Sequence, residues 1–108
     1  ISVGDHLSML QYATYSVASP EACSSIIWRT PDKASEAADA MKVCSHELLK
    51  INIIDEIISE PLGGAHRNYD EVSAQIKHSL IQNLAKLSQL SSEDLVRRRY
   101  KRLMQIGI

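Results

Sequence analysis

Only two stretches of this 108-residue sequence have the pattern of β-strands, and that limits the folds open to it. Residues 9–17 alternate in polarity and include aromatic and β-branched side chains, which favours a strand. Residues 51–58 are so rich in isoleucine that we expect a strand buried on both faces. Two strands form only a marginal sheet without neighbours. We therefore expect a part of the protein preceding residue 1 to supply most of the sheet.

Three helices are predicted between these strands. Residues 19–29 begin with a Ser-Pro-Glu sequence, which is typical of a helix cap and first turn. Thr30, also followed by proline, repeats this start signal, and the helix after it has small residues on one face. That stripe consists of Ala34, Ala37, Ala38 and Met41. A third, short helix is expected over residues 45–50, with Ser45 as its cap.

The two longest helices are predicted at the C-terminal end. Asn68, with Glu71 three residues on, has the pattern of a capping box, and Ser91 with Asp94 starts the last helix. The first of these helices carries an apolar stripe made of Val72, Ile76, Leu80, Leu84, Leu87 and Leu90. The last helix has an apolar side, expected to pack on the preceding helix, made of Val96, Tyr100, Leu103 and Met104. Its other side, expected to be solvated, is made of Arg97, Arg98, Lys101 and Arg102.

The composition is that of a soluble globular protein. Apolar residues make up 44% of the sequence and the net charge is -1, so the totals favour neither a nucleic-acid binder nor a disordered tail. No apolar run approaches the roughly 20 residues that span a bilayer, so we expect a cytoplasmic protein that does not enter a membrane. Cys23 and Cys44 lack the short spacing of a zinc site, and free thiols are expected.

Two segments are candidates for a functional site. Ser19, Pro20 and Glu21 lie between a predicted strand and a predicted helix, where backbone N–H groups can bind an anion or a polarised carbonyl; a plain helix cap is the alternative. Residues 63–67, with the sequence Gly-Gly-Ala-His-Arg, offer flexible backbone donors, the bidentate Arg67 and the titratable His66. The alternative for this second segment is a simple turn between strand and helix.

The remaining ionisable residues do not form a catalytic or metal-binding set. His6, His46 and His78 have no metal-ligand spacing to one another or to the cysteines. Asp55 and Glu56 are adjacent along a strand and face opposite ways, so they cannot act as a paired acid and base. The basic cluster over residues 97–102 leaves open a different function, a helical module whose basic face binds an acidic protein or a nucleic acid.

Three segments in order along the chain, residues 12–21, 53–67 and 91–104, resemble the alpha subunits of bacterial multi-subunit acetyl-CoA carboxylase carboxyltransferases. The resemblance covers the whole chain and implies that it is the C-terminal part of such a subunit. It implies a fragment of a ClpP/crotonase-like α/β domain, mostly helical, with two strands and two long C-terminal helices. Residues 1–67 would then complete the crotonase-like core, which includes a helix, short helix and strand unit over residues 32–58, and residues 68–108 would form a helical extension.

The resemblance also implies the reaction and its partners. Such enzymes transfer the carboxyl group of carboxybiotin, held on the biotin carboxyl carrier protein, to acetyl-CoA, and so form malonyl-CoA for fatty acid biosynthesis. The implied partners are a zinc-bearing beta subunit and a second alpha subunit in a heterotetramer of two alpha and two beta chains, together with the ATP-using biotin carboxylase. This chain is expected to bind no metal or cofactor itself and to be inactive alone, because the glycine-rich catalytic donors of the family precede residue 1.

The resemblance assigns two roles within the chain. Ser19, Pro20, Glu21 and Ala22 would support one wall of the carboxybiotin pocket, with Ala22 standing where the family has glycine. The signature Pro61-Leu62-Gly63-Gly64-Ala65-His66-Arg67 would shape the site or a subunit interface. A different crotonase-like acyl-CoA enzyme is a third possibility, against which stand the three signatures in order. We also expect the fragment to dimerise or to swap elements, which would cover apolar surface.

Overall fold

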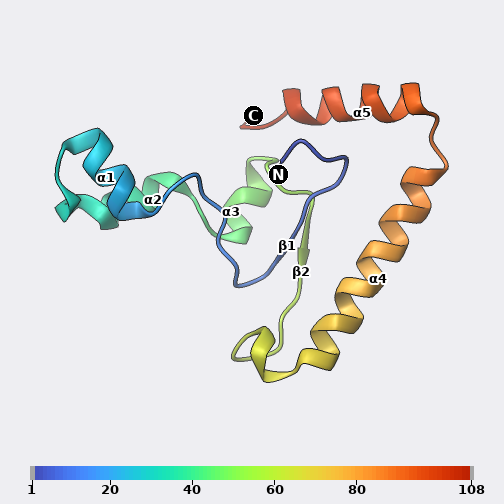
Figure 1. Ribbon diagram of the computed structural model, residues 1–108, viewed down its shortest axis with the longest axis horizontal. Coiled ribbons are helices and arrows are strands. Elements are labelled where there is room, and N and C mark those ends of the chain that lie inside the picture. Colours follow the sequence, from blue (N-terminus) through green and yellow to red (C-terminus); the bar gives the residue numbers. More distant parts are fainter. Residues whose placement is uncertain (1, 108) are drawn as a thin grey trace.

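The computed structural model describes residues 2–107, which form a flat and open arrangement (Figure 1). Its extents are 49 × 37 × 18 Å, and its radius of gyration is 16.6 Å. A compact domain of this length would have a radius of gyration of about 13 Å. The chain therefore spreads its elements around a small centre instead of enclosing one large core.

The sheet consists of two short parallel strands, β1 (Ser8–Leu10) and β2 (Glu56–Ile58). Their register pairs Met9 with Ile57. Both predicted strands were too long. The chain turns immediately after β1, where Ala13 N donates to Leu10 O over 3.1 Å, and Thr14 forms only an isolated antiparallel bridge with Cys44.

The predicted strand over residues 51–58 is wrong in its first half because that half completes the preceding helix. Ile51 N donates to Glu47 O over 3.3 Å, and Ile53 N donates to Leu48 O over 3.0 Å. Asn52 between them has φ of +64°, which reverses the chain. These isoleucines therefore pack around a turn, and only residues 56–58 are free to pair with β1.

Two helices form a pair at one end of the molecule, drawn in cyan and green in Figure 1. They are α1 (Pro20–Trp28) and α2 (Ala34–Met41), joined by a single turn of 3₁₀ helix, η1 (Pro31–Lys33). The predicted small-residue face is used here, since Ala37 is 2% exposed. Ser24 is fully buried, and its hydroxyl donates to Thr30 O while accepting from Lys33 N.

The third helix, α3 (Ser45–Lys50), has the predicted bounds. Its cap residue is Cys44 and not Ser45, so the predicted cap is wrong. The buried Ser45 hydroxyl instead donates to Gln11 O over 2.7 Å. This hydrogen bond fixes the helix to the turn that follows β1.

A small apolar core lies between α3 and the sheet. Met9, Leu48 and Ile54 are its buried centre, with exposed fractions of 8%, 2% and 2%. Partly buried side chains surround this centre, namely Leu7, Ala13, Tyr15, Ile51, Ile53 and Ile57. Met9 and Ile57 come from the strands and Leu48 from α3, whereas the rest of this core comes from the turns and segments that connect them.

The two long helices are α4 (Tyr69–Ser88) and α5 (Ser92–Met104), and Figure 1 shows them meeting at a corner that frames the strands. Their predicted starts are confirmed, because Asn68 Oδ1 accepts from Glu71 N over 3.1 Å and Ser91 Oγ accepts from Asp94 N over 3.2 Å. Half of the six residues in the apolar stripe predicted for α4 are exposed, namely Leu80, Leu84 and Leu90. Val72 is buried, whereas Leu84 is 63% exposed.

The orientation of α5 corrects the sequence prediction. Its predicted apolar side faces outward, since Val96, Tyr100 and Met104 are 60% exposed or more. Its inner face carries arginines, and Arg102 is buried at 9% exposure. The carboxylates of Asp5 and Asp55 form ion pairs with arginines on that face. The helix α5 is therefore held by ion pairs and not by the packing of apolar side chains. Within residues 2–107, no helix is both long and apolar enough to cross a membrane.

Candidate functional site

The loop between β2 and α4 contains one turn of 3₁₀ helix, η2 (Ala65–Arg67), preceded by two glycines in left-handed conformations. Gly63 has φ of +93° and Gly64 has φ of +105°. A methyl group on Gly63 would stand 3.0 Å from Cγ of Arg67. Both glycines are thus favoured by the left-handed backbone, and the Arg67 side chain further limits the space at Gly63.

Glu60 fixes this loop to the end of β1. Its Oε1 accepts from Ala65 N over 2.9 Å, and its Oε2 accepts from Tyr12 N over 2.5 Å. Its own N–H donates to Oε1 of Gln11 over 3.1 Å. One carboxylate therefore joins the two signature segments that lie 48 residues apart in the sequence.

Most of the backbone donors of the loop are used internally. Gly64 N donates to Pro61 O over 2.9 Å, Arg67 N donates to Gly64 O over 3.1 Å, and Ala65 N is held by Glu60. The side chains of His66 and Arg67 are exposed, and His66 lines an open hollow of about 790 Å³. Its lining consists of Tyr12, Glu60, Leu62, Gly63, Gly64, Ala65, His66 and Tyr69. A partner that binds this loop would therefore contact mainly its side chains, because most of its backbone donors are already used.

The other candidate segment is the first turn of α1. Ser19 is the N-cap, as predicted, and its hydroxyl accepts from Ala22 N over 3.1 Å. Pro20 has no N–H. Within the part of the chain that the structure describes, Glu21 N makes no hydrogen bond, so it points one donor out of the positive end of the helix. This N–H can donate one hydrogen bond to an oxygen atom of a ligand.

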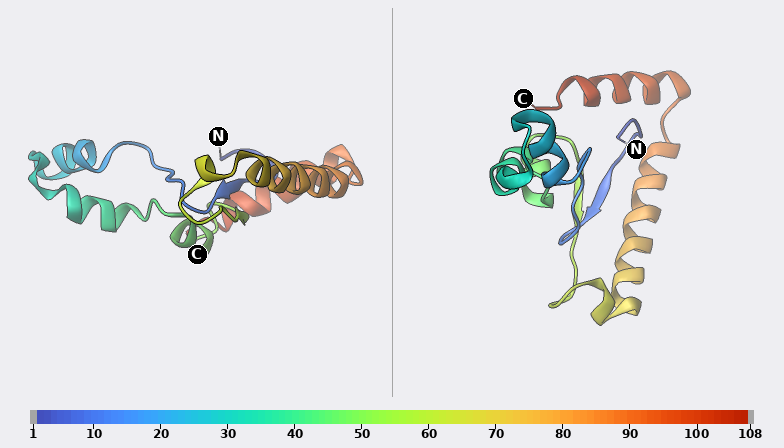
Figure 2. Two further views of the ribbon diagram at one scale, coloured as in Figure 1. Left: turned by 90° about the horizontal axis from the view of Figure 1, so that it is seen from below. Right: turned by 60° about the vertical axis from the view of Figure 1, so that its left-hand side comes forward.

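Over the described residues 2–107, the two candidate segments lie apart and line no common pocket. Figure 1 and both views of Figure 2 show α1 and α2 at one end of the molecule, whereas η2 lies beside the start of α4. The pairing that the structure does make is between the loop and Tyr12, through Glu60.

A polar cluster that was not predicted from the sequence surrounds Glu56 at the start of β2. Oε2 of Glu56 accepts from Ser79 Oγ over 2.7 Å, from Ser8 Oγ over 2.8 Å, from His6 Nε2 over 3.0 Å and from Asn83 Nδ2 over 3.2 Å. The hydrogen bond from Ser79 is the main cause of a low pKa of Glu56, about 2 against an ordinary 4.5, which partial burial opposes. Ser79 and Asn83 interrupt the apolar face of α4. This interruption is the feature of the sequence that could have indicated the cluster.

A second set of charges holds α5 in place. Arg99 forms a two-pronged contact with Asp5, Nε to Oδ1 and Nη2 to Oδ2, each at 2.9 Å. This contact holds the pKa of the Asp5 carboxyl below its ordinary value. Nε of Arg102 donates to Oδ2 of Asp55 over 2.7 Å. Asp55 and Glu56 therefore bind different partners, although Asp55 precedes β2 and does not share a strand with Glu56 as was expected.

Among residues 2–107, no three His, Cys, Asp or Glu side chains are grouped so that they could hold a metal ion. Cys23 is half-buried and Cys44 is exposed, and both are free thiols. Neither candidate segment brings a nucleophile within hydrogen-bonding distance of a base in the described residues. As described, the two segments can position a ligand or shape a pocket, but they do not bring together a catalytic set.

Comparison with known proteins places the chain in a family. A family model described as acetyl co-enzyme A carboxylase carboxyltransferase-like matches residues 1–107. The acetyl-coenzyme A carboxylase carboxyl transferase subunit alpha of Photorhabdus laumondii is 53% identical over 107 residues, covering 99% of this chain and 34% of that protein. The subunits of Vibrio campbellii and Haemophilus influenzae are 54% and 52% identical with the same coverage. The chain spans about a third of the length of these curated relatives, and it belongs to the acetyl-CoA carboxylase carboxyltransferase alpha family.

Proposed function

We propose that this chain is the C-terminal part of a carboxyltransferase alpha subunit, and that it contributes to carboxyl transfer from carboxybiotin to acetyl-CoA with formation of malonyl-CoA. The observation that carries the proposal is identity above 50% over 107 residues to subunits whose names state the carboxyl transfer activity. We also propose that the chain is inactive alone and forms part of the scaffold and pocket wall around donors elsewhere in the complex, since the two candidate segments, as described over residues 2–107, pair no nucleophile with a base.

Carboxybiotin, a substrate delivered by the biotin carboxyl carrier protein, supplies the carboxyl group. The first turn of α1 is suited to the polar end of carboxybiotin, because the free N–H of Glu21 and the positive end of the helix favour an oxygen that carries negative charge. Ser19 keeps this turn in shape by capping Ala22 N. We propose that the methyl group of Ala22 limits how closely a ligand approaches the backbone of this turn.

We propose that the Gly63–Arg67 loop contacts another subunit or helps to shape the carboxyl-transfer site. Its support is the geometry of Arg67, whose stem lies against Gly63 while its guanidinium stays exposed. An exposed planar guanidinium is suited to a carboxylate or a row of carbonyl oxygens on a partner. The nearby hydrophobic Leu62, 94% exposed, adds an apolar contact for such a partner.

The wider setting follows from the same proposal. Residues 1–67 would complete a ClpP/crotonase-like core, to which the open edges of a two-stranded sheet are suited, and residues 68–108 would be a helical extension. The complex would be cytoplasmic and contain two alpha and two zinc-bearing beta subunits. It would work with the biotin carboxyl carrier protein and biotin carboxylase.

A chimera tests the proposal. In it, residues 1–107 of this chain replace the matching segment of the Vibrio campbellii subunit, and malonyl-CoA formation is assayed with beta subunit, acetyl-CoA and a carboxybiotin donor. We expect activity that depends on every component. A chimera that folds and assembles with the beta subunit but forms no malonyl-CoA would refute the assignment.

Variants within the chimera test the two segments. Arg67→Ala is expected to lower the rate on the order of tenfold, because misplacement of a positioned group costs at least that much. Ala22→Gly, which removes the methyl group near the proposed pocket, is expected to retain or raise the rate. Lys86→Ala, on the exposed side of α4, is the control and should leave the rate unchanged.

A further inference from the structure

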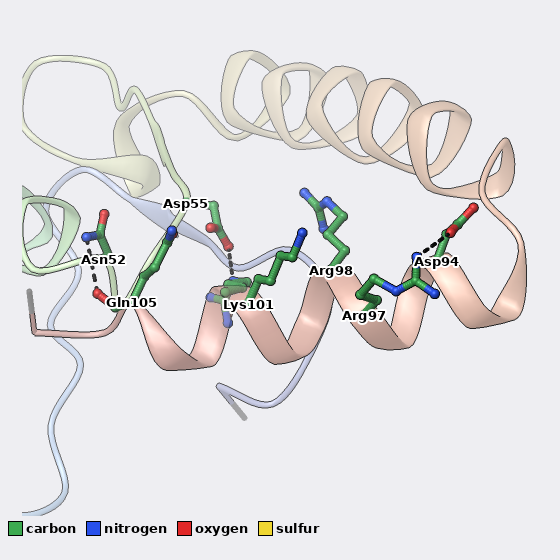
Figure 3. Close-up of a pocket in the computed structure, with 8 residues that line it drawn as sticks. Asn52, Asp55, Asp94, Arg97, Arg98, Lys101 and Gln105 are labelled. Carbon is green, nitrogen blue, oxygen red and sulfur yellow. Dashed lines mark hydrogen bonds and ion pairs between the residues drawn. The ribbon is translucent and has the colours of Figure 1, made fainter.

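A cleft under the inner face of α5 has chemistry that the carboxyl-transfer proposal does not use. It has a volume of about 540 Å³ and lies between α5 and the turn that follows α3 (Figure 3). Its lining consists of Asn52, Asp55, Asp94, Arg97, Arg98, Lys101, Arg102 and Gln105. All of these side chains are polar or charged.

The charges lining the cleft do not cancel. There are four cations against two carboxylates, which leaves an excess of two positive charges. Arg102 is neutralised by Asp55 at 2.7 Å, and Arg97 lies 3.9 Å from Asp94. Within residues 2–107, Arg98 and Lys101 form no ion pair, so they carry the excess.

The two uncompensated cations are three residues apart on α5, which makes them neighbours on the helix surface. Figure 3 shows both side chains projecting from α5 on the side of the cleft, while Arg97 turns toward Asp94. Nη1 of Arg98 donates to the backbone carbonyl of Asp5 over 2.6 Å, which steadies the guanidinium without neutralising it. Arg98 is therefore partly preorganised to bind an anion.

The floor of the cleft is rigid. The guanidinium of Arg102, with a side chain only 8% exposed, donates to Asp55 and to the carbonyl oxygens of Ser2 and Ile53, each at 3.0 Å or less. Asn52 Nδ2 donates to Gln105 O over 3.3 Å and closes one end. These hydrogen bonds fix the Arg102 side chain at the floor of the cleft.

We propose that this cleft binds a phosphate group of a small molecule, with Lys101 and Arg98 as its main ligands. A phosphate accepts several charge-assisted hydrogen bonds at once, which two convergent cations can donate. The C-terminal half of α5 places the negative end of the helix dipole nearby, so the side chains alone must supply the attraction. The volume leaves room for more than one phosphate, and pyrophosphate is therefore the probe.

The test titrates inorganic pyrophosphate into the ¹⁵N-labelled 108-residue chain at constant ionic strength and follows amide shifts by NMR. We expect saturable shifts at Asn52, Lys101 and Gln105, and an affinity for Lys101→Glu that is weaker by about tenfold or more, as for one lost charge-assisted hydrogen bond. Lys86→Glu makes the same charge change on α4, away from the cleft, and should bind as the parent does.

Two outcomes would overturn the proposal. If Lys101→Glu and Lys86→Glu weaken binding equally, the attraction is the diffuse charge of the surface and not a site. If a single-stranded oligonucleotide binds while pyrophosphate does not shift the cleft residues, the basic face recognises an extended polyanion instead. Because the readout is direct binding to this chain, neither result depends on whether the chain takes part in carboxyl transfer.

Discussion

Arg102 and Asp55 are 47 residues apart in the sequence, and the hydrogen bond of 2.7 Å between Nε and Oδ2 joins α5 to the segment that enters β2. The same Oδ2 accepts from Leu7 N over 2.9 Å, so one carboxylate oxygen ties α5 to the start of β1 as well. The helix is held to the body by a buried charge at the place where the sequence pattern predicted an exposed one.

Removing this charge should destabilise the chain. Arg102→Ala leaves Asp55 without its cationic partner and removes the donor to the carbonyls of Ser2 and Ile53, so the free energy of unfolding is expected to fall by about 3 kcal/mol. Arg97→Ala, which removes an arginine whose side chain is 67% exposed, should change it by no more than about 0.5 kcal/mol. Urea unfolding followed by circular dichroism measures both. Equal effects would show that Arg102 is not anchored as described.

Glu56 makes stability depend on pH in acid. Its pKa in the folded chain is about 2, and its ordinary value is 4.5, so its contribution is complete above about 4.5 and is lost as the pH falls toward 2. Glu56→Gln should remove that part of the pH dependence. The measurement is the urea midpoint of both proteins between pH 7 and pH 2.5, and parallel curves would contradict the low pKa.

The hydrogen bond from Ser79 is the largest cause of this shift. In Ser79→Ala the pKa of Glu56 should rise toward its ordinary value, because the carboxylate loses its shortest donor at 2.7 Å. The carboxyl ¹³C shift of Glu56, followed by NMR during an acid titration, reports the change. Ser73→Ala, also on α4 but exposed, should leave the titration of Glu56 as it is.

Gly63 should not tolerate a side chain. Gly63→Ala places a methyl group at φ of +93° and 3.0 Å from Arg67 Cγ, so a loss of about 1 to 2 kcal/mol is expected. Gly4→Ala meets no atom within 4 Å and serves as the control. Thermal unfolding of the two variants should differ by several degrees, and equal melting temperatures would show that the loop conformation differs from the one described.

The exposed apolar face of α4 should drive self-association. Leu80 and Leu84 are 57% and 63% exposed, and burying such surface between two copies is favourable. Sedimentation equilibrium is expected to give a mass that rises with concentration for the parent and less so for Leu80→Glu with Leu84→Glu. Gln82→Glu on the same helix is the charge control. A parent that stays monomeric at all concentrations would contradict this expectation.

Local signals predicted the helices well. Ser19, Asn68 and Ser91 cap the helices that they were expected to cap, because capping depends on a few neighbouring residues. The strands were overestimated because isoleucines at 51–54 pack equally well around a turn, which periodicity cannot distinguish from a strand.

Long-range charge pairing could not be predicted from local pattern. The inward turn of the α5 arginines depends on Asp5 and Asp55, which are distant in the sequence and carry no mark of their partners. The Glu56 cluster depends in the same way on Ser79 and Asn83 from α4. The two candidate segments were recognised as segments, but their separation in space and the link through Glu60 are properties of the fold.

The measurement that tests the central claim most directly is the initial rate of malonyl-CoA formation by the chimera that carries this chain. With beta subunit and carboxybiotin donor present, we expect a rate close to that of the intact Vibrio campbellii subunit, and none when the 108-residue chain is supplied alone. A correctly folded, fully assembled chimera without activity would contradict the assignment of this chain to a carboxyltransferase.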